Sequence, residues 1–301
     1  MDFPSSCVVS GQELWQWFSG AKAAALKADI PTSEVDWLLG ELAGLDRLIL
    51  RLESFKDWPK IQLRLSLEEL DRLWYRRLDE RVPLQYLTGV AYWRNFSLEV
   101  GTGVLIPRPE TECLIDLAVA ATNAFPFLGE GNWVDLGTGS GAIAFGLAEV
   151  WTNAFVYGID SSFEALAIAE KNANKLGLVD RVTFYQGFWW QPLEHLQGQI
   201  SGMVANPPYI PTSMVQTLQS EVSKHEPHLA LDGGADGLDC IRFLISTAPL
   251  YLVSGGVWLV EMMAGQANVV QQMLESHGSY CQIEIFSDLE GVERFAMAYL
   301  R

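Results

Sequence analysis

The sequence predicts an α/β protein in which a mostly parallel, doubly wound sheet of seven strands follows a small helical domain. Two observations predict this arrangement. From about residue 106 onward, short apolar segments alternate with helical segments, which is typical of parallel strands joined by crossover helices. Residues 11 to about 80 carry helical periodicity instead. A chain of 301 residues is long enough for one large or two unequal domains.

The first part of the chain is expected to form a helical domain over residues 1–82. Apolar side chains from Leu14 onward recur at helical spacing, and residues 66–69, Ser-Leu-Glu-Glu, form a capping-box pattern before a further apolar stripe. Residues 83–105 are rich in aromatic and aliphatic side chains punctuated by glycine, which predicts a β-hairpin connector. Residues 106–301 would then form the second domain.

The strand candidates of the second domain are short runs of β-branched, aromatic and aliphatic side chains. Helical stretches lie between most of them, notably residues 163–176 and 238–252. Only residues 287–293 separate the last two candidates, which is too short for a helical crossover, so we expect them to pair antiparallel. The candidates are residues 133–136, 156–160, 182–186, 202–205, 257–260, 282–286 and 295–300.

The formal net charge of -17 bears on the partners that the protein can have. Affinity for nucleic acid depends largely on Lys and Arg side chains that neutralise phosphates, so we expect no nucleic-acid partner. An acidic surface instead favours a basic protein partner, mainly by raising the rate of association.

The cysteines and the apolar runs indicate a cytoplasmic protein without a metal or a membrane partner. Cys7, Cys113, Cys240 and Cys281 are scattered and form no Cys-x-x-Cys pair, so neither a zinc site nor a disulfide framework is expected. Free thiols are typical of a reducing cytosol. The start of the chain does not resemble a signal peptide, and no apolar run reaches the roughly 20 residues that span a membrane.

A glycine-rich turn follows the first strand candidate. Residues 135–141 read Asp-Leu-Gly-Thr-Gly-Ser-Gly and open a helix at Ala142. Glycine lets the backbone approach a ligand closely, and Asp160 ends the next strand, where a carboxylate can accept hydrogen bonds from both ribose hydroxyls. These features predict a site for an adenine nucleoside at the carboxyl ends of the strands. The candidate cofactor-binding residues here are Gly137, Thr138, Gly139, Ser140, Gly141 and Asp160.

A second motif, Asn206-Pro207-Pro208-Tyr209, follows the strand candidate at 202–205. Two prolines stiffen the loop. The Asn206 side-chain oxygen and the Pro207 carbonyl are two acceptors that can hold both hydrogens of a planar NH₂ group, and the Tyr209 ring can lie flat against it. An amide nitrogen is a poor nucleophile, so the site must act chiefly by positioning. Asn206, Pro207 and Tyr209 are therefore the catalytic candidates, and all four residues are candidates for binding substrate.

Together the two motifs predict a methyltransferase that uses S-adenosylmethionine and alkylates an amide or amino nitrogen. The spacing of Gly137, Gly139 and Ala142 also fits a dinucleotide fingerprint. A dehydrogenase, however, does not need an Asn-Pro-Pro-Tyr loop, and the loop therefore favours the methyltransferase.

The chain resembles the release factor glutamine N5-methyltransferases, the PrmC/HemK family, over nearly its whole length. Residues 135–141 resemble the family's first motif, and residues 206–209 its catalytic tetrapeptide. Both motifs are shared with adenine-N6 methyltransferases, and three further stretches are more specific to the family. They are residues 81–89, residues 103–112 with the sequence Gly-Val-Leu-Ile-Pro-Arg-Pro-Glu-Thr-Glu, and the loop at 225–238.

The resemblance implies a class I S-adenosylmethionine-dependent fold, Rossmann-like, in which residues 106–301 form the catalytic domain. It implies transfer of a methyl group to the side-chain amide nitrogen, N5, of the glutamine in the Gly-Gly-Gln loop of class I peptide chain release factors, with S-adenosylhomocysteine as product. The helical domain would help to bind the release factor. Trp189 would flank the adenine, and Asn206 would touch both cofactor and substrate.

The chain departs from the family pattern at two places. Phe188 stands where an acid commonly precedes the tryptophan, so that Trp190 is an alternative partner for the adenine. After the strand at 257–260 the chain reads Glu261-Met262-Met263 where the family often reads Glu-His-Gly.

Two other functions remain open from the sequence. An adenine-N6 DNA or RNA methyltransferase would share both motifs, but it would need a basic groove. A binding module that keeps only the nucleoside pocket would not need an intact Asn206–Tyr209 loop. Among other polar residues, Arg108 and Glu110 either order the cofactor pocket or pair with each other near the domain junction, and His225 is expected to be structural.

Overall fold

The computed structural model describes residues 7–123 and 125–301. By its internal contacts the chain divides into two compact units. The first is Met1–Gly89 together with Ser220–His225, and the second is Val90–Gln219 together with Glu226–Arg301. Within the described residues, no helix combines the length and the apolar character needed to cross a membrane.

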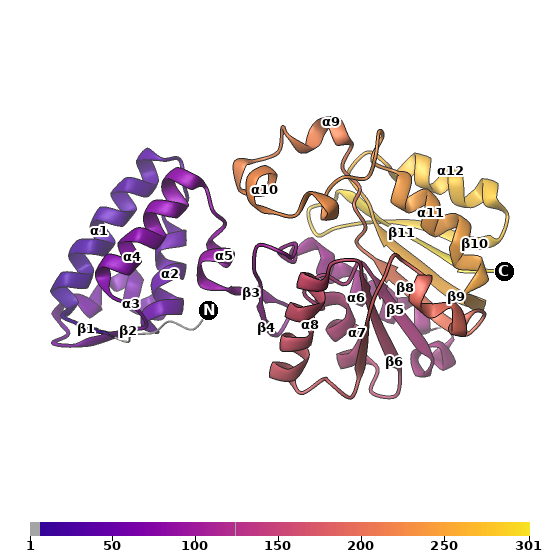
Figure 1. Ribbon diagram of the computed structural model, residues 1–301, viewed down its shortest axis with the longest axis horizontal. Helices are drawn as coiled ribbons and strands as arrows, with labels where there is room; N and C mark the ends of the chain where they lie inside the picture. Colours follow the sequence, from indigo (N-terminus) through magenta and orange to yellow (C-terminus); the bar gives the residue numbers. More distant parts are fainter. Residues whose placement is uncertain (1–6, 124) are drawn as a thin grey trace. The chain divides into compact units, whose positions relative to one another are not determined.

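The first unit is built mainly of helices, in which α1 packs on both α2 and α4 (Figure 1). The capping box expected at Ser66 is present, because Ser66 and Glu69 exchange hydrogen bonds at the start of α4. A pair of short antiparallel strands, β1 and β2, was not expected, since three-residue strands leave no readable alternation. The elements are β1 (Cys7–Val9), α1 (Gly11–Lys27), α2 (Ser33–Ala43), α3 (Arg47–Leu52), β2 (Ile61–Leu63), α4 (Leu67–Tyr75), α5 (Leu84–Thr88) and α10 (Ser220–His225).

Helix α10 belongs to the first unit through a buried arginine. Arg77 donates two hydrogen bonds to the carboxylate of Glu34, at 2.6 and 2.9 Å, and a third to Glu221 at 2.8 Å. A guanidinium in a fixed fork suits this arrangement, and burial makes the pairing necessary. His225 lies 2.7 Å from the Glu80 carbonyl oxygen through Nε2, which gives this histidine a structural partner.

The second unit contains a seven-stranded sheet in the order β10-β11-β9-β8-β5-β6-β7. The strands β5, β6, β7, β8 and β9 are parallel, and β11 pairs antiparallel with both β9 and β10. The predicted α/β fold and the antiparallel last pair are thus confirmed. The strands are β5 (Asn132–Leu136), β6 (Phe155–Asp160), β7 (Val182–Gln186), β8 (Ile200–Ala205), β9 (Leu252–Glu261), β10 (Tyr280–Ser287) and β11 (Glu293–Leu300), and a hairpin of β3 (Val90–Trp93) and β4 (Phe96–Glu99) precedes them.

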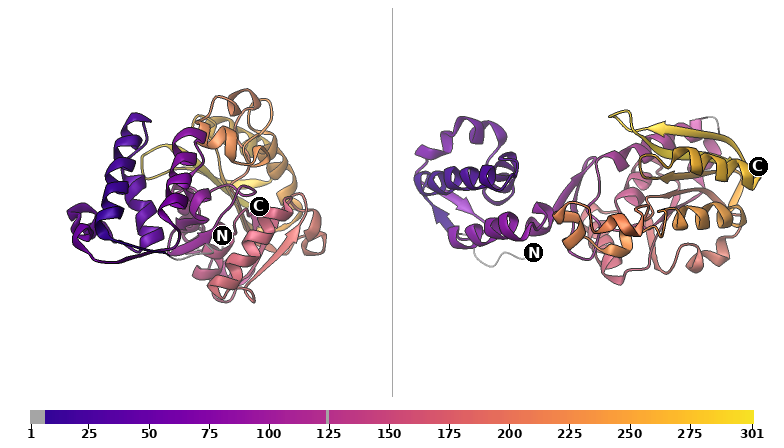
Figure 2. Two further views of the ribbon diagram at one scale, coloured as in Figure 1. Left: turned by 60° about the vertical axis from the view of Figure 1, so that its left-hand side comes forward. Right: turned by 90° about the horizontal axis from the view of Figure 1, so that it is seen from above.

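Helices cover the two faces of the sheet and create two cores. Along β9, Val257 and Leu259 belong to one core, whereas Trp258 and Val260 belong to the other, as the period of a strand requires. The first core includes α6 (Cys113–Asn123), α7 (Ala142–Val150) and α8 (Phe163–Leu176). The second includes α11 (Asp239–Thr247) and α12 (Ala267–His277), which lie side by side in Figures 1 and 2.

Several predicted boundaries differ from the structure by one or two residues, and two differ by more. The helix expected at 238–252 ends at Thr247, because Pro249 lies in the short 3₁₀ turn that follows it. The strand expected at 257–260 begins earlier, at Leu252, since Gly255 and Gly256 hid its amino-terminal half. Neither difference moves the carboxyl ends of the strands, where the motifs lie.

Candidate active site

The glycine-rich turn joins the end of β5 to helix α7. Gly137, Gly139 and Gly141 have φ angles of 83°, 55° and 89°, a region that residues with a Cβ seldom adopt. The backbone N–H groups of Gly137 and Thr138 both donate to the Ile159 carbonyl, at 2.8 and 2.9 Å. A Cβ atom added to Gly137 would meet no atom nearer than 4.0 Å, so open space faces the turn at this position.

Asp160, the last residue of β6, holds the turn from the neighbouring strand. Its carboxylate accepts the N–H of Gly139 at 2.9 Å through Oδ2 and the N–H of Ser162 at 2.9 Å through Oδ1. Burial raises the pKa of this carboxyl, and the backbone hydrogen bonds oppose that effect. Each carboxylate oxygen keeps a second acceptor position, so Asp160 can still receive hydroxyl donors.

The rest of the turn points into the protein. The Thr138 hydroxyl donates to Asp135 at 2.6 Å, and the N–H of Ala144 donates to the same oxygen at 3.0 Å. Burial raises the pKa of Asp135 to about 7. Thr138, Ser140 and Gly141 shape the turn but do not border the cavity that it faces.

The cavity has a volume of about 340 Å³, which is within the range of small-molecule sites. It brings together five of the residues predicted to bind the cofactor: Gly137, Gly139, Asp160, Trp189 and Asn206. The rest of the lining includes three stretches that the motifs did not indicate as cofactor contacts. These are residues 103–105, residues 161–165 around the start of α8, and the loop residues 227–232 together with Cys240.

Trp189 and Trp190 have different surroundings. Trp189 borders the cavity and has a φ of 53°, a left-handed conformation that is rare for an aromatic residue. Trp190 is only 3% exposed and stacks on Tyr251 with ring centres 4.5 Å apart. The ring that can reach a ligand is therefore Trp189. Phe188, in the place of the family's acid, is 63% exposed and borders the same cavity.

The Asn206–Tyr209 loop follows β8 at the same edge of the sheet. Asn206 and Pro208 border the cavity, whereas Pro207 is buried and does not border it. Tyr209 does not border the cavity, because its hydroxyl donates to Glu261 at 3.1 Å. Stacking of the Tyr209 ring on a planar substrate stays a prediction.

A buried network supports the loop and was not foreseen from the sequence. The Asn206 side-chain NH₂ donates to the Thr111 hydroxyl at 3.2 Å, and this hydroxyl donates to Glu261 Oε2 at 2.7 Å. Glu261, the last residue of β9, is fully buried, and burial raises its pKa to about 7. Two sequence signals existed: Thr111 lies in the family-specific stretch at 103–112, and Glu261 is a carboxylate at the end of a strand.

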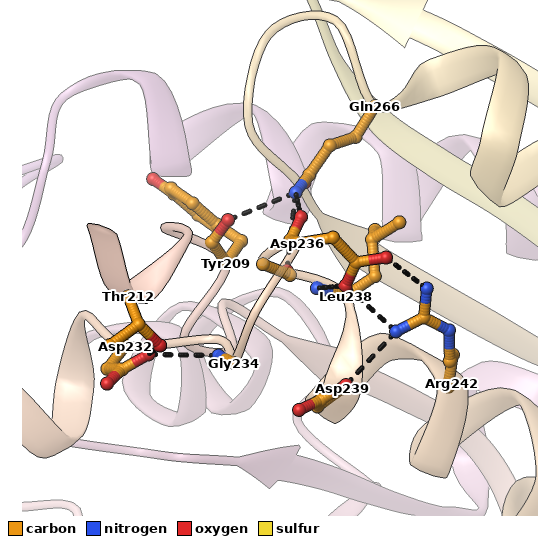
Figure 3. Close-up of polar contacts among 10 residues, drawn as sticks. Tyr209, Thr212, Asp232, Gly234, Asp236, Leu238, Asp239, Arg242 and Gln266 are labelled. Atoms are coloured by element: carbon orange, nitrogen blue, oxygen red, sulfur yellow. Dashed lines mark hydrogen bonds and ion pairs between the residues drawn. The ribbon is translucent and has the colours of Figure 1, made fainter. Parts of the chain in front are cut away.

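A second unforeseen residue, Gln266, ties the loop to the chain that follows it (Figure 3). Its side-chain NH₂ lies 3.0 Å from the Tyr209 carbonyl, and 3.4 and 3.3 Å from the carbonyls of Asp236 and Gly237. The Asp236 carboxylate in turn pairs with Arg242 of helix α11. The side chain of Gln266 therefore links the backbone at Tyr209 to the backbone at residues 236 and 237.

Arg108 and Glu110 do not pair with each other in the structure. Arg108 instead binds the buried carboxylate of Glu226 at 2.7 Å, and Glu226 also accepts the N–H of Ile106 at 3.4 Å. Since Pro227 borders the cavity, this ion pair anchors one wall of it.

Comparisons with known proteins agree with this geometry. A family model described as "Methyltransferase domain" matches residues 129–207. Among solved structures, the hMettl16 catalytic domain in complex with MAT2A 3′UTR hairpin 1 has a TM-score of 0.52 at 12% identity, over 77% of this chain and 79% of that chain, which is a likeness of fold alone. The second unit, which contains the matched residues, thus has the fold of a class I methyltransferase.

Two full-length relatives define the family. A protein of Synechocystis sp. is 50% identical over 96% of this chain and 97% of its own length. A protein of Thermosynechococcus vestitus is 47% identical over 96% of this chain and 99% of its own length. Both are named release factor glutamine methyltransferase. The chain belongs to the release factor glutamine methyltransferase family.

Proposed function

We propose that the chain transfers a methyl group from S-adenosylmethionine to N5 of the glutamine in the Gly-Gly-Gln loop of class I peptide chain release factors. One observation carries this proposal: the Asn206 side chain borders the same cavity as Gly139, Asp160 and Trp189. In this proposal, Asn206 is the acceptor for a planar NH₂ group and the other three residues bind the cofactor beside it. This arrangement is what methylation of a glutamine side chain requires, and the relatives are named release factor glutamine methyltransferase.

The cavity residues fit S-adenosylmethionine as cofactor. Open space above Gly137 lets the ligand approach the backbone, and Asp160 can accept its ribose hydroxyls. Trp189 offers an aromatic face for the adenine. The cofactor supplies a methyl group made electrophilic by a positive sulfur. The proposed reaction uses no metal cofactor. Its second product is S-adenosylhomocysteine.

The protein's part in the reaction is positioning. The Asn206 Oδ1 atom and the Pro207 carbonyl accept the two hydrogens of the glutamine NH₂, which places its nitrogen toward the methyl group. As the nitrogen–carbon bond forms, the sulfur keeps the electron pair of the bond that breaks. The extra proton then leaves the nitrogen past Asn206 to water. Pro208 completes the wall of the substrate pocket.

The release factor is proposed to bind both units. Residues 1–82 would contribute recognition outside the catalytic cavity, and residues 83–105 would connect them to the catalytic domain at 106–301. The net charge of -17 favours a partner with a basic surface. A cytoplasmic site of action accords with the four free cysteines.

The test uses the full chain, labelled S-adenosylmethionine and three acceptors: a release factor, its Gly-Gly-Gln→Gly-Gly-Ala variant, and DNA. We expect label on the first acceptor alone, with mass spectrometry placing one methyl group on the glutamine. Equal label on the alanine variant would exclude glutamine as the site. Label on DNA would favour the adenine-N6 alternative.

A further inference from the structure

We propose that Glu261 and Thr111 set the direction of the Asn206 amide, so that its oxygen rather than its nitrogen faces the substrate. The two residues act as positioning groups, and neither touches the substrate. The inference deepens the proposed function and rests on it, because a directed acceptor is useful only for a donor such as a glutamine NH₂.

The direction begins at the Glu261 carboxylate. Above the pKa of about 7 that burial gives Glu261, this carboxylate is ionised. An ionised carboxylate can only accept hydrogen bonds, so both of its neighbours must donate to it. Thr111 Oγ1 donates to Oε2 at 2.7 Å, and the Tyr209 hydroxyl donates to Oε1 at 3.1 Å. Burial, together with the charge of Glu261, raises the pKa of Tyr209, which keeps its hydroxyl protonated. Each carboxylate oxygen therefore accepts one hydrogen bond from a hydroxyl group.

Thr111 passes this direction on to Asn206. A threonine hydroxyl has one hydrogen, and Thr111 uses it in the hydrogen bond that it donates to Glu261. Toward Asn206 the hydroxyl oxygen can then only accept, and Asn206 Nδ2 lies 3.2 Å from it. The nitrogen end of the amide is thus fixed on Thr111. The oxygen end remains for the cavity that Asn206 borders.

This control is needed because the two ends of an asparagine amide have nearly the same shape. Rotation by half a turn about its last side-chain bond exchanges oxygen and nitrogen without a steric penalty, so the hydrogen-bond partners decide between them. In the rotated form, Asn206 would present NH₂ hydrogens to the NH₂ hydrogens of glutamine. The substrate nitrogen would then lose an acceptor and its position.

Glu261→Gln is the sharpest test of the relay, since glutamine preserves shape and the number of hydrogen bonds. Its oxygen can accept from Tyr209, and its NH₂ can donate to Thr111. Thr111 can then donate to Asn206 Oδ1, which releases the amide to rotate. We expect kcat to fall about 10²-fold, as for a small misplacement of a reacting group, while the affinity for S-adenosylmethionine stays close to wild type.

Thr111→Val removes the relay hydroxyl at nearly constant volume, and we expect a similar loss of kcat. Thr111→Ser restores the hydroxyl and should recover most of it. The matched control is Thr122→Val, since the exposed fraction of Thr122 is 6% and that of Thr111 is 4%. The Thr122 hydroxyl donates a hydrogen bond to the Val119 carbonyl within α6. The control variant should keep wild-type kcat.

A second measurement does not depend on activity. The side-chain NH₂ signals of Asn206, identified in the NMR spectrum by their loss in Asn206→Ala, should shift in Glu261→Gln and Thr111→Val and stay in place in Thr122→Val. The relay is wrong if these signals do not move, or if Glu261→Gln keeps wild-type kcat. If the wild-type protein does not methylate glutamine at all, the proposed function fails, and the NMR signals still decide the relay.

Discussion

The two halves of the cavity are built in different ways. Where β5 and β6 end, the backbone makes the site, because glycines give the turn its shape and Asp160 is bonded to the N–H of Gly139. Where β8 ends, side chains make the site, because Asn206 depends on Thr111 and through it on Glu261. The first half is built from groups 21 positions apart, whereas the second joins groups 95 and 150 positions apart.

This difference separates two tasks. A backbone turn is rigid and is suited to holding a cofactor whose shape does not change. A hydrogen-bonded side-chain network has a direction, and a direction is what a substrate amide must be given. We therefore expect substitutions in the β5–β6 half to change cofactor affinity, and substitutions in the β8 half to change kcat.

The largest effect is expected for Asn206→Ala. Loss of the acceptor should lower kcat by about 10³-fold or more, since it removes a group that holds the reacting nitrogen. Cofactor binding, measured by calorimetry, should largely remain. The matched control is Asn132→Ala at the start of β5, where the side chain bonds only the Gln199 carbonyl. A comparable kcat for both variants would remove Asn206 from the mechanism.

Asp160→Ala should act on the other half. The variant loses the acceptor for Gly139 and for the cofactor's ribose, so its affinity for S-adenosylmethionine should fall about 10²-fold, the effect of two charge-assisted hydrogen bonds. At saturating cofactor, kcat should stay near wild type. The exposed Asp180 supplies the control, Asp180→Ala, with unchanged affinity. A large loss of kcat with unchanged affinity for Asp160→Ala would contradict the division of tasks.

The same contrast explains what the sequence predicted. The seven strands of the large sheet and the turn at 137–141 follow from local patterns, since apolar runs and glycines carry their own conformational preference. The contact of Thr111 with Glu261 does not, because nothing local links a threonine in a 3₁₀ turn to a strand end 150 residues later. Gln266 was missed for the same reason, since its partners are backbone carbonyls of other segments.

A smaller effect is expected for Gln266→Leu, which tests whether the β8 half needs its backbone held. The carbonyl of Tyr209 would lose a buried donor, which costs about 1–3 kcal/mol of folding stability. We expect a lower melting temperature and a loss of kcat smaller than for Glu261→Gln. The control for the change of residue type is Gln271→Leu in α12, the helix that begins directly after Gln266, where the Gln271 side chain donates to Glu275. Wild-type kcat in Gln266→Leu would show that side chains alone hold Asn206.

The smallest effect concerns the stability of the folded protein. It distinguishes a Glu261 that sets the direction of the Asn206 amide from a Glu261 that only stabilises the fold. Burial is the main cause that raises the pKa of Glu261 from 4.5 to about 7, Glu110 adds to it, and Thr111, Tyr209 and Arg294 oppose it. The folded protein therefore binds this proton more tightly than the unfolded chain. The stability that results is complete below pH 4.5 and is lost as the pH rises to about 7.

Glu261→Gln does not titrate, so its melting temperature relative to wild type should rise across that interval and then remain level. Above pH 7 we expect the melting temperature of the variant, relative to that of wild type, to be higher than it is at pH 4.5. Asp135, whose pKa is also raised to about 7, titrates in both proteins and cancels in the difference. A variant that is more stable and yet slower would mean that the buried charge of Glu261 serves to direct the Asn206 amide rather than to stabilise the fold. A variant that is both less stable and slower at pH 8 would make Glu261 a structural residue of the β8 half.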